Sequence, residues 1–209
     1  MKILELFAGS RSFSKVAEEL GHETFCVDNE PFDNTDLVKD VEELLPNDIP
    51  FKPDIIWASP PCQSYSICGC AAHRRNRIAF SEFGKKSDRL VKKTLMLIKH
   101  YDCIFYIENP RAILRKMDFM KGIPRATVWY CQYGDNSAKP TDIFSNNLGS
   151  VLNPSGWFPK NECKNGNKNC HHQPAPRGSK TGTQGKKNAY FRSIVPSELC
   201  REILEGHNA

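Results

Sequence analysis

The sequence has no hydrophobic run long enough to cross a bilayer. A transmembrane helix needs about 20 mostly apolar residues, and the apolar N-terminal stretch is interrupted by Glu5 and ends in small and polar residues at positions 8–12. The same stretch is too short to be a secretory signal. We therefore expect a soluble, cytoplasmic protein with no membrane partner.

The chain also lacks the even set of cysteines that is typical of a disulfide framework. It has nine, and without a secretory signal we expect reduced thiols, metal ligands or a nucleophile. Two Cys/His groups could bind zinc, but neither has the spacing of a standard zinc finger. We therefore predict free thiols and surface histidines with no metal, and a structural zinc ion is the alternative. The first group is Cys68, Cys70 and His73. The second is Cys163, Cys170, His171 and His172, of which Cys163, Cys170 and His171 are the preferred ligand candidates.

Acidic residues are scarce in two later segments. Residues 160–192 hold eight Lys/Arg against one acid, and residues 73–93 hold eight against two, whereas residues 1–50 hold twelve Asp/Glu against four Lys/Arg. Two basic segments can clasp a polyanion, although a solvated surface is the alternative. The acidic beginning would repel phosphates but suits a cationic cofactor.

The pattern of apolar residues predicts an α/β domain with a mostly parallel sheet. The composition, 39% hydrophobic and 25% charged over 209 residues, is that of one globular domain. Short apolar runs alternate with stretches of helical periodicity, which is typical of parallel sheets. We expect strands at 2–7, 23–28, 54–59, 103–108 and 127–132, and helices at 13–20, 85–101 and 195–204, the last with Ser197 as N-cap.

The chain divides into three parts on composition. Residues 1–145 carry the strand and helix pattern and form the expected main domain. Residues 146–190 are rich in Asn, Gly, Pro, Ser and Lys with little periodicity, which predicts a small irregular lobe. Residues 191–209 should return to the main domain as a C-terminal helix.

Small and acidic residues follow the first strands, where ligands gather in open α/β sheets. The turn at Phe7, Ala8, Gly9 and Ser10 allows a close backbone approach, although a glycine there can be purely conformational. Asp28, at the end of the strand predicted at 23–28, can hydrogen-bond a ribose diol or belong to an ordinary turn. Asp40, after a third apolar run, can accept a hydrogen bond from an adenine amino group or cap a helix.

A cysteine and a glutamate follow two further strands. Cys62 lies on a turn stiffened by Pro60 and Pro61, where a thiol is poised rather than packed. Thiolate attack on carbon 6 of a pyrimidine makes carbon 5 nucleophilic. A proton held by Glu108 near N3 would support the charge, although this residue can also cap the next helix.

Together these segments resemble the DNA cytosine-5 methyltransferases. Five short motifs occur in the family's order, in residues 3–145: Phe7-Ala8-Gly9, Val27-Asp28-Asn29-Glu30-Pro31, Lys39-Asp40-Val41, Pro61-Cys62-Gln63 and Glu108-Asn109. The resemblance implies a Rossmann-like S-adenosylmethionine-dependent methyltransferase fold, S-adenosyl-L-methionine as cofactor, and double-stranded DNA with a flipped cytosine as substrate. The short lobe at residues 146–190 resembles that of compact phage-encoded or prophage members. We favour a monomer.

The resemblance also implies roles for individual residues. Cys62, Glu108 and Lys139 are the expected catalytic residues, with Lys139 in place of the family's arginine motif. Residues 64–86 correspond to a mobile loop that closes over the target. The expected cofactor contacts are Phe7, Ala8, Gly9, Ser10, Asp28, Asn29, Asp40, Val41, Ser59 and Pro61. The expected nucleic-acid contacts are Gln63, Ser64, Arg74, Arg75, Arg77, Arg177, Ser179, Lys180 and Thr181.

Departures from the family pattern keep other functions open. Residues 10–12, Ser-Arg-Ser, stand where family members have further glycines, and Pro110 replaces the usual valine. A protein that keeps the fold but only binds DNA is therefore one alternative. Methylation of an exocyclic amino group is a second, because Ser59-Pro60-Pro61 also resembles the motif of those enzymes, and cytosine-5 methylation of transfer RNA is a third.

Overall fold

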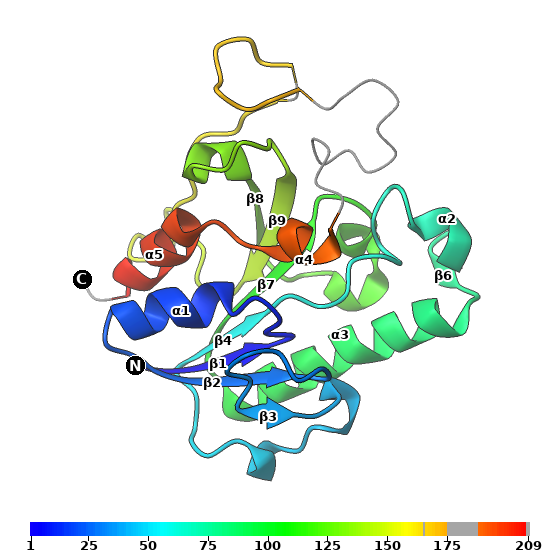
Figure 1. The fold of residues 1–209 in the computed structure, drawn as a ribbon, viewed down its shortest axis with the longest axis vertical. Helices are drawn as coiled ribbons and strands as arrows, with labels where there is room; N and C mark the ends of the chain where they lie inside the picture. Colours follow the sequence, from blue (N-terminus) through cyan, green and yellow to red (C-terminus); the bar gives the residue numbers. More distant parts are fainter. Residues whose placement is uncertain (165, 175–187, 208–209) are drawn as a thin grey trace.

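A seven-stranded mixed sheet forms the centre of the molecule (Figure 1). The computed structural model describes residues 1–164, 166–174 and 188–207. The strand order is β3-β2-β1-β4-β7-β9-β8, in which β3, β2, β1, β4 and β7 run parallel and β9 is antiparallel to both of its neighbours. The strands are β1 (Lys2–Leu6), β2 (Glu23–Asp28), β3 (Leu37–Val38), β4 (Ile55–Ala58), β7 (Ile104–Pro110), β8 (Arg125–Trp129) and β9 (Pro140–Ser145).

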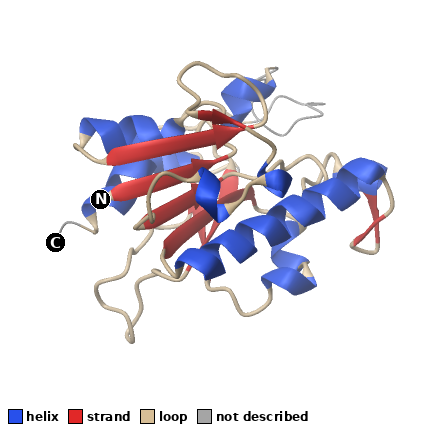
Figure 2. Cartoon of the chain, turned by 90° about the horizontal axis from the view of Figure 1, so that it is seen from below, coloured by secondary structure: helices blue, strands red, loops and turns tan. Residues whose placement is uncertain are grey.

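Helices cover both faces of the sheet (Figure 2). One face packs against α1 (Ser12–Glu19) and α5 (Ser197–Glu205), and the other packs against α3 (Glu82–Tyr101). Neighbouring strand residues alternate between the faces: Ile55 and Trp57 join the first cluster, whereas Ile56 and Ala58 join the second. The remaining elements are short: α2 (Cys70–His73), the hairpin β5 (Arg74–Arg75) and β6 (Ile78–Ala79), α4 (Ala189–Ser193), and the 3-10 turns η1 (Val41–Glu43), η2 (Pro46–Asp48), η3 (Leu114–Lys116), η4 (Asp118–Met120) and η5 (Tyr130–Tyr133).

The sequence prediction of a mostly parallel α/β sheet is confirmed, with three local corrections. The strand expected at 127–132 ends at Trp129 and continues as η5. Strand β9 was not predicted, because its apolar pattern is interrupted by Asp142, which is buried in an ion pair with Arg115. The N-cap of α5 is Pro196 rather than Ser197.

The described part of the 146–190 segment is irregular, and Trp157 packs it against the main core. Trp157 is buried, and its ring packs edge-on against Tyr106 of β7 at 6.2 Å between centroids. Its Nε1 donates to Glu202 of α5 at 2.9 Å. Among the described residues, no helix is long and apolar enough to span a bilayer.

Candidate active site

The carboxyl ends of β1, β2, β4 and β7 bring together the segments that the sequence singled out. The backbone N–H of Ala8 donates to Val27 at 3.1 Å, which joins the ends of β1 and β2. Between β1 and β4, the N–H of Ser59 donates to the carbonyl of Leu6 at 3.3 Å. Because these strands are parallel, all of their polar termini lie at one edge of the sheet.

The turn between β1 and α1 is built on left-handed backbone. Phe7, Gly9 and Arg11 have φ values of 58°, 41° and 52°. Arg11 adopts a conformation that favours glycine, and its side chain is buried, with Nε 3.3 Å from Cys26 Sγ and an ion pair to Glu18. These contacts hold the turn in place where family members have further glycines.

The amino end of α1 is occupied by a carboxylate of the chain itself. The N–H of Ser14 donates to Glu5 Oε2 at 2.7 Å, which satisfies an N–H group that a helix start leaves free. Burial raises the pKa of Glu5, and the hydrogen bonds from Ser14 oppose this shift. A ligand bound at this edge of the sheet therefore meets the side of the turn rather than the start of the helix.

Asp28 lies where the sequence predicts a carboxylate that binds the cofactor. It is buried at the end of β2, and its Oδ2 and Oδ1 accept from the N–H groups of Gly9 at 2.9 Å and Glu30 at 3.0 Å. A carboxylate has about four lone-pair sites, so two of them stay available to a ribose diol. S-adenosylmethionine fits this site, because Asp28 can accept hydrogen bonds from its ribose and Gly9 has no side chain to block its approach to the turn.

Asp40 has a structural role that the sequence left open. Its side chain caps η1 by accepting from the N–H of Glu42 at 2.9 Å, and it pairs with Lys86 Nζ of α3 at 2.6 Å. Its pKa is lowered, because these contacts outweigh a desolvation that acts in the opposite direction. The capping alternative is thus confirmed, whereas contact with adenine stays a prediction, as does the role of its buried neighbour Val41.

Cys62 follows β4 on the double-proline turn. Its carbonyl accepts from the N–H groups of Tyr65 at 3.0 Å and Ser66 at 2.8 Å, so the chain turns sharply just after the thiol. The side chain of Asn109, at the end of β7, donates to the carbonyl of Pro60 at 3.0 Å and ties the turn to the neighbouring strand. Cys62 is half-buried, whereas Gln63 next to it is exposed.

The electrostatic surroundings of Cys62 act in both directions. Burial raises the pKa of the thiol, and the negative charge of Glu108 raises it further. The positive charges of Lys139 and Arg192 lower it. The thiol therefore lies within the electrostatic reach of both predicted catalytic partners, and in the resting site the protonated form is favoured.

A buried tyrosine and a lysine hold Glu108. The hydroxyl of Tyr130 donates to Glu108 Oε1 at 2.8 Å, and Lys139 Nζ is 3.9 Å from the same oxygen. Lys139 lies over the Tyr130 ring at 4.4 Å and donates to the carbonyl of Arg192 at 2.7 Å. The sequence had not pointed to Tyr130, which looked like a core aromatic, or to Arg192, which follows the irregular segment.

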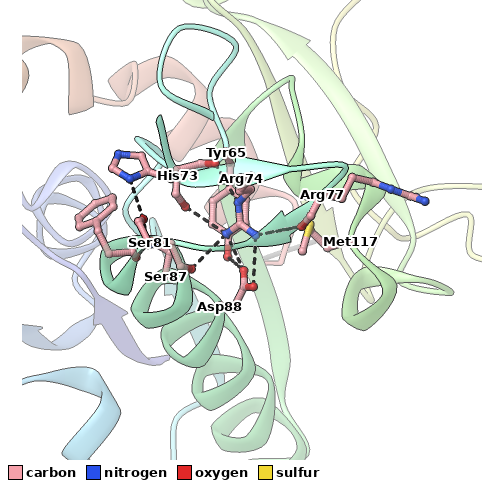
Figure 3. Close-up of polar contacts among 11 residues, drawn as sticks. Tyr65, His73, Arg74, Arg77, Ser81, Ser87, Asp88 and Met117 are labelled. Carbon is pink, nitrogen blue, oxygen red and sulfur yellow. Dashed lines mark hydrogen bonds and ion pairs between the residues drawn. The ribbon is translucent and has the colours of Figure 1, made fainter. Parts of the chain in front are cut away.

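The basic segment after Cys62 is anchored by a buried arginine (Figure 3). Arg74 donates to the carbonyl of Ser64 at 2.9 Å and pairs with Asp88 of α3 at 2.6 Å, and its guanidinium stacks on Tyr65 at 4.2 Å. Its side chain is only 2% exposed. The prediction that Arg74 and Ser64 contact nucleic acid is therefore wrong for this conformation, because both are buried against each other.

Of the remaining residues expected to contact nucleic acid, some are exposed on the surface and others lie outside the described residues. Arg75 and Arg77 are exposed on the hairpin, and Arg77 also donates to the carbonyl of Lys116 at 3.2 Å. The two arginines stay candidates for phosphate binding. Arg177, Ser179, Lys180 and Thr181 lie outside the described residues.

The metal-ligand candidates are regrouped by the fold. Cys163 and Cys170 lie together with Cys131 and His172, with all four ligand atoms within 4.8 Å of one another. His171 is outside this group, because its Nε2 faces the carbonyl of Asp135 at 3.1 Å. The sequence spacing missed Cys131 because it comes from a different part of the chain.

Comparison with known proteins adds a relative that matches over nearly the whole length of both chains. No family model matches the chain. It is 29% identical over 224 residues to the "Probable DNA (cytosine-5)-methyltransferase" of Frog virus 3 (isolate Goorha), covering 98% of this chain and 99% of that protein. A phage origin has no support in this match.

Solved methyltransferase structures share the fold. A DNMT2 variant from Spodoptera frugiperda superposes with a TM-score of 0.50 at 19% identity, covering 83% of this chain and 57% of the other. The Entamoeba histolytica methyltransferase EhMeth gives 0.52 at 14% identity, with 78% and 57% covered. The S. pombe Dnmt2 methyltransferase gives 0.50 at 15% identity, with 72% and 52% covered.

This chain thus spans little more than half the length of these structures. Its sheet matches their S-adenosylmethionine-dependent methyltransferase fold. The relative from Frog virus 3 matches it over nearly its whole length. The chain is therefore similar over nearly its whole length to a probable DNA (cytosine-5)-methyltransferase, and it has the fold of the solved methyltransferases.

Proposed function

We propose that this chain methylates carbon 5 of cytosine in DNA through a covalent adduct at Cys62. The observation that carries the proposal is the shared electrostatic environment of Cys62, Glu108 and Lys139, on the turns and strand ends of one sheet edge. A thiol, a carboxyl group and a cation are the groups that this reaction needs. The expected cofactor, S-adenosylmethionine, supplies an electrophilic methyl group when it is bound.

Cys62 acts as the nucleophile. Its thiol loses a proton, Sγ bonds to carbon 6 of the target base, and the electron pair of the C5–C6 double bond becomes available at carbon 5. After carbon 5 is substituted, loss of its proton and cleavage of the Sγ–C6 bond restore the double bond and release Cys62. The Asn109–Pro60 hydrogen bond fixes the turn, so the direction of the thiol is set before the base arrives.

Glu108 holds a proton at N3 of the base while the adduct forms. Its contacts with Tyr130 and Lys139 both involve Oε1, so among the described residues Oε2 is the oxygen left for the base. Tyr130 fixes the orientation of the carboxyl group, and Lys139 offsets its charge when it is ionised. The basic residues Arg75 and Arg77 on the hairpin after Cys62 are exposed and could bind phosphates of the duplex.

Trapping on a fluorinated substrate tests the proposal. DNA containing 5-fluorocytosine cannot lose the group at carbon 5 and should become covalently attached to the wild-type protein in the presence of S-adenosylmethionine. Cys62→Ala should give no adduct and no methyl transfer. Cys103→Ala is the matched control, because Cys103 precedes β7 at the opposite edge of the sheet, and it should form the adduct.

Three results would contradict the proposal. Methyl transfer that survives Cys62→Ala would exclude the covalent route, and N4-methylcytosine or N6-methyladenine in digested DNA would indicate exocyclic amino methylation. Tight DNA binding without cofactor binding in calorimetry would indicate a protein that only binds DNA. Parallel assays with duplex DNA and transfer RNA identify the polymer.

A further inference from the structure

Three cysteines and one histidine from two distant parts of the chain meet beside η5. Cys131 lies in η5, and Cys163, Cys170 and His172 lie in the irregular segment that follows β9, drawn in yellow and orange at the top of Figure 1. One ligand atom from each lies within 4.8 Å of the other three. We propose that these residues bind one structural zinc ion.

The distances suit tetrahedral coordination. A Zn–S distance of about 2.3 Å places neighbouring ligand atoms about 3.7 Å apart around the ion. Cys163 Sγ and His172 Nδ1 are already 3.8 Å apart. The other pairs lie within 4.8 Å, so they need to approach by no more than about 1 Å. Three thiolates and one imidazole form one of the usual structural zinc sets.

The burial pattern supports a bound ion rather than a hydrophobic contact. Among the described residues of 158–174, only Cys163 and His172 are buried, whereas Phe158 is 57% exposed. A segment that folds by hydrophobic contact buries its aromatic residues and leaves its imidazoles outside. Here the potential ligands face inward, as in small zinc-stabilised segments that have no core of their own.

The site has four protein ligands and therefore no open position for a substrate. A structural role follows, in which the ion fastens residues 163–172 to η5. Hydrogen bonds reinforce the same junction, because Gln173 N donates to the carbonyl of Asn136 at 2.9 Å and His171 Nε2 faces the carbonyl of Asp135 at 3.1 Å. Since η5 begins with Tyr130, the partner of Glu108, the zinc site lies next to the proposed catalytic network.

Metal analysis of the purified full-length chain tests the site. Protein produced in zinc-supplemented medium and purified under reducing conditions should contain about one zinc per chain by mass spectrometry. After chelation, added Co²⁺ should give the visible absorption of tetrahedral cobalt with thiolate charge-transfer bands. Cys131→Ser and His172→Ala should lose both signals.

Matched controls separate the site from other thiols and histidines. His171→Ala and Cys103→Ser should keep the zinc and the cobalt spectrum. Cys170→Ser removes a half-buried ligand and serves as a second test if Cys131→Ser fails to fold. Wild-type protein without zinc and without a tetrahedral cobalt spectrum would overturn the proposal. So would iron in place of zinc, or fewer than nine thiols titrated in unreduced, denatured protein, because that count would reveal a disulfide.

Discussion

Replacing Asp88 by asparagine tests whether the basic segment after Cys62 is anchored by Arg74. Asp88 Oδ1 accepts from Arg74 Nη2 at 2.6 Å and from the hydroxyl of Tyr65 at 2.8 Å, and Oδ2 lies 3.2 Å from Arg74 Nη1. Asp88→Asn keeps the volume of the side chain but removes its charge. The guanidinium of Arg74 then stays buried without a counter-ion.

The expected cost follows from the burial of the pair. Breaking a buried ion pair by removing one partner costs about 3–5 kcal/mol. Because the Asp88 side chain is 18% exposed and that of Arg74 is 2% exposed, we expect the lower end, about 3 kcal/mol. In a domain of this size the loss lowers the melting temperature by about 6–12 °C, or the urea midpoint by about 1 M.

Urea unfolding followed by tryptophan fluorescence measures this cost, because Trp57, Trp129 and Trp157 are all buried. Glu82→Gln is the matched control on the same helix. Its pair with Lys85 has the same kind of geometry, 2.8 Å, but both side chains are at least half exposed, so the midpoint should not change measurably. Equal midpoints for Asp88→Asn and Glu82→Gln would refute the anchoring argument.

Two further predictions concern the site. Glu108→Gln removes a negative charge near Cys62 and should lower the pKa of the thiol, whereas Lys139→Met removes a positive charge and should raise it. The rate of Cys62 alkylation as a function of pH, followed by peptide mass spectrometry, measures both pKa values. A shift of the same sign in the two variants would contradict the electrostatic assignment. Arg75→Ala should weaken DNA binding and reduce the slope of log K against log salt by about 0.9, because one phosphate contact is lost; an unchanged slope in fluorescence anisotropy titrations would show that Arg75 makes no such contact.

Much of the fold could be predicted from local pattern. The buried strands and the helices α1 and α3 follow directly from apolar runs and helical periodicity. Strand β9 could not be found this way, because Asp142 breaks its pattern, and only Arg115, from a distant turn, makes a buried aspartate acceptable there. Tertiary pairing overrides local propensity in such a strand.

The same distinction applies to the candidate site. Cys62, Asp28 and Glu108 follow strands, and a parallel sheet brings such positions to one edge whatever the details of packing. Arg74 was misassigned because its buried acceptors Ser64 and Asp88 are not visible as a set in the sequence. Cys131 and Tyr130 were missed for a similar reason, since their partners come from segments more than 20 residues away.

The charges around Cys62 imply that substrate binding itself activates the thiol. In the resting site, burial and the carboxylate of Glu108 both raise the pKa of Cys62, which keeps it protonated and protects it from unspecific reactions. On the proposed mechanism, Glu108 holds a proton against N3 of the base, so its negative charge disappears when a target is present. The opposing charges of Lys139 and Arg192 then act without that carboxylate, and the pKa of the thiol falls. Glu108→Gln mimics this neutral state without a base. It should therefore alkylate faster at Cys62 than the wild type at neutral pH, while transferring methyl groups more slowly because the amide cannot supply the proton at N3.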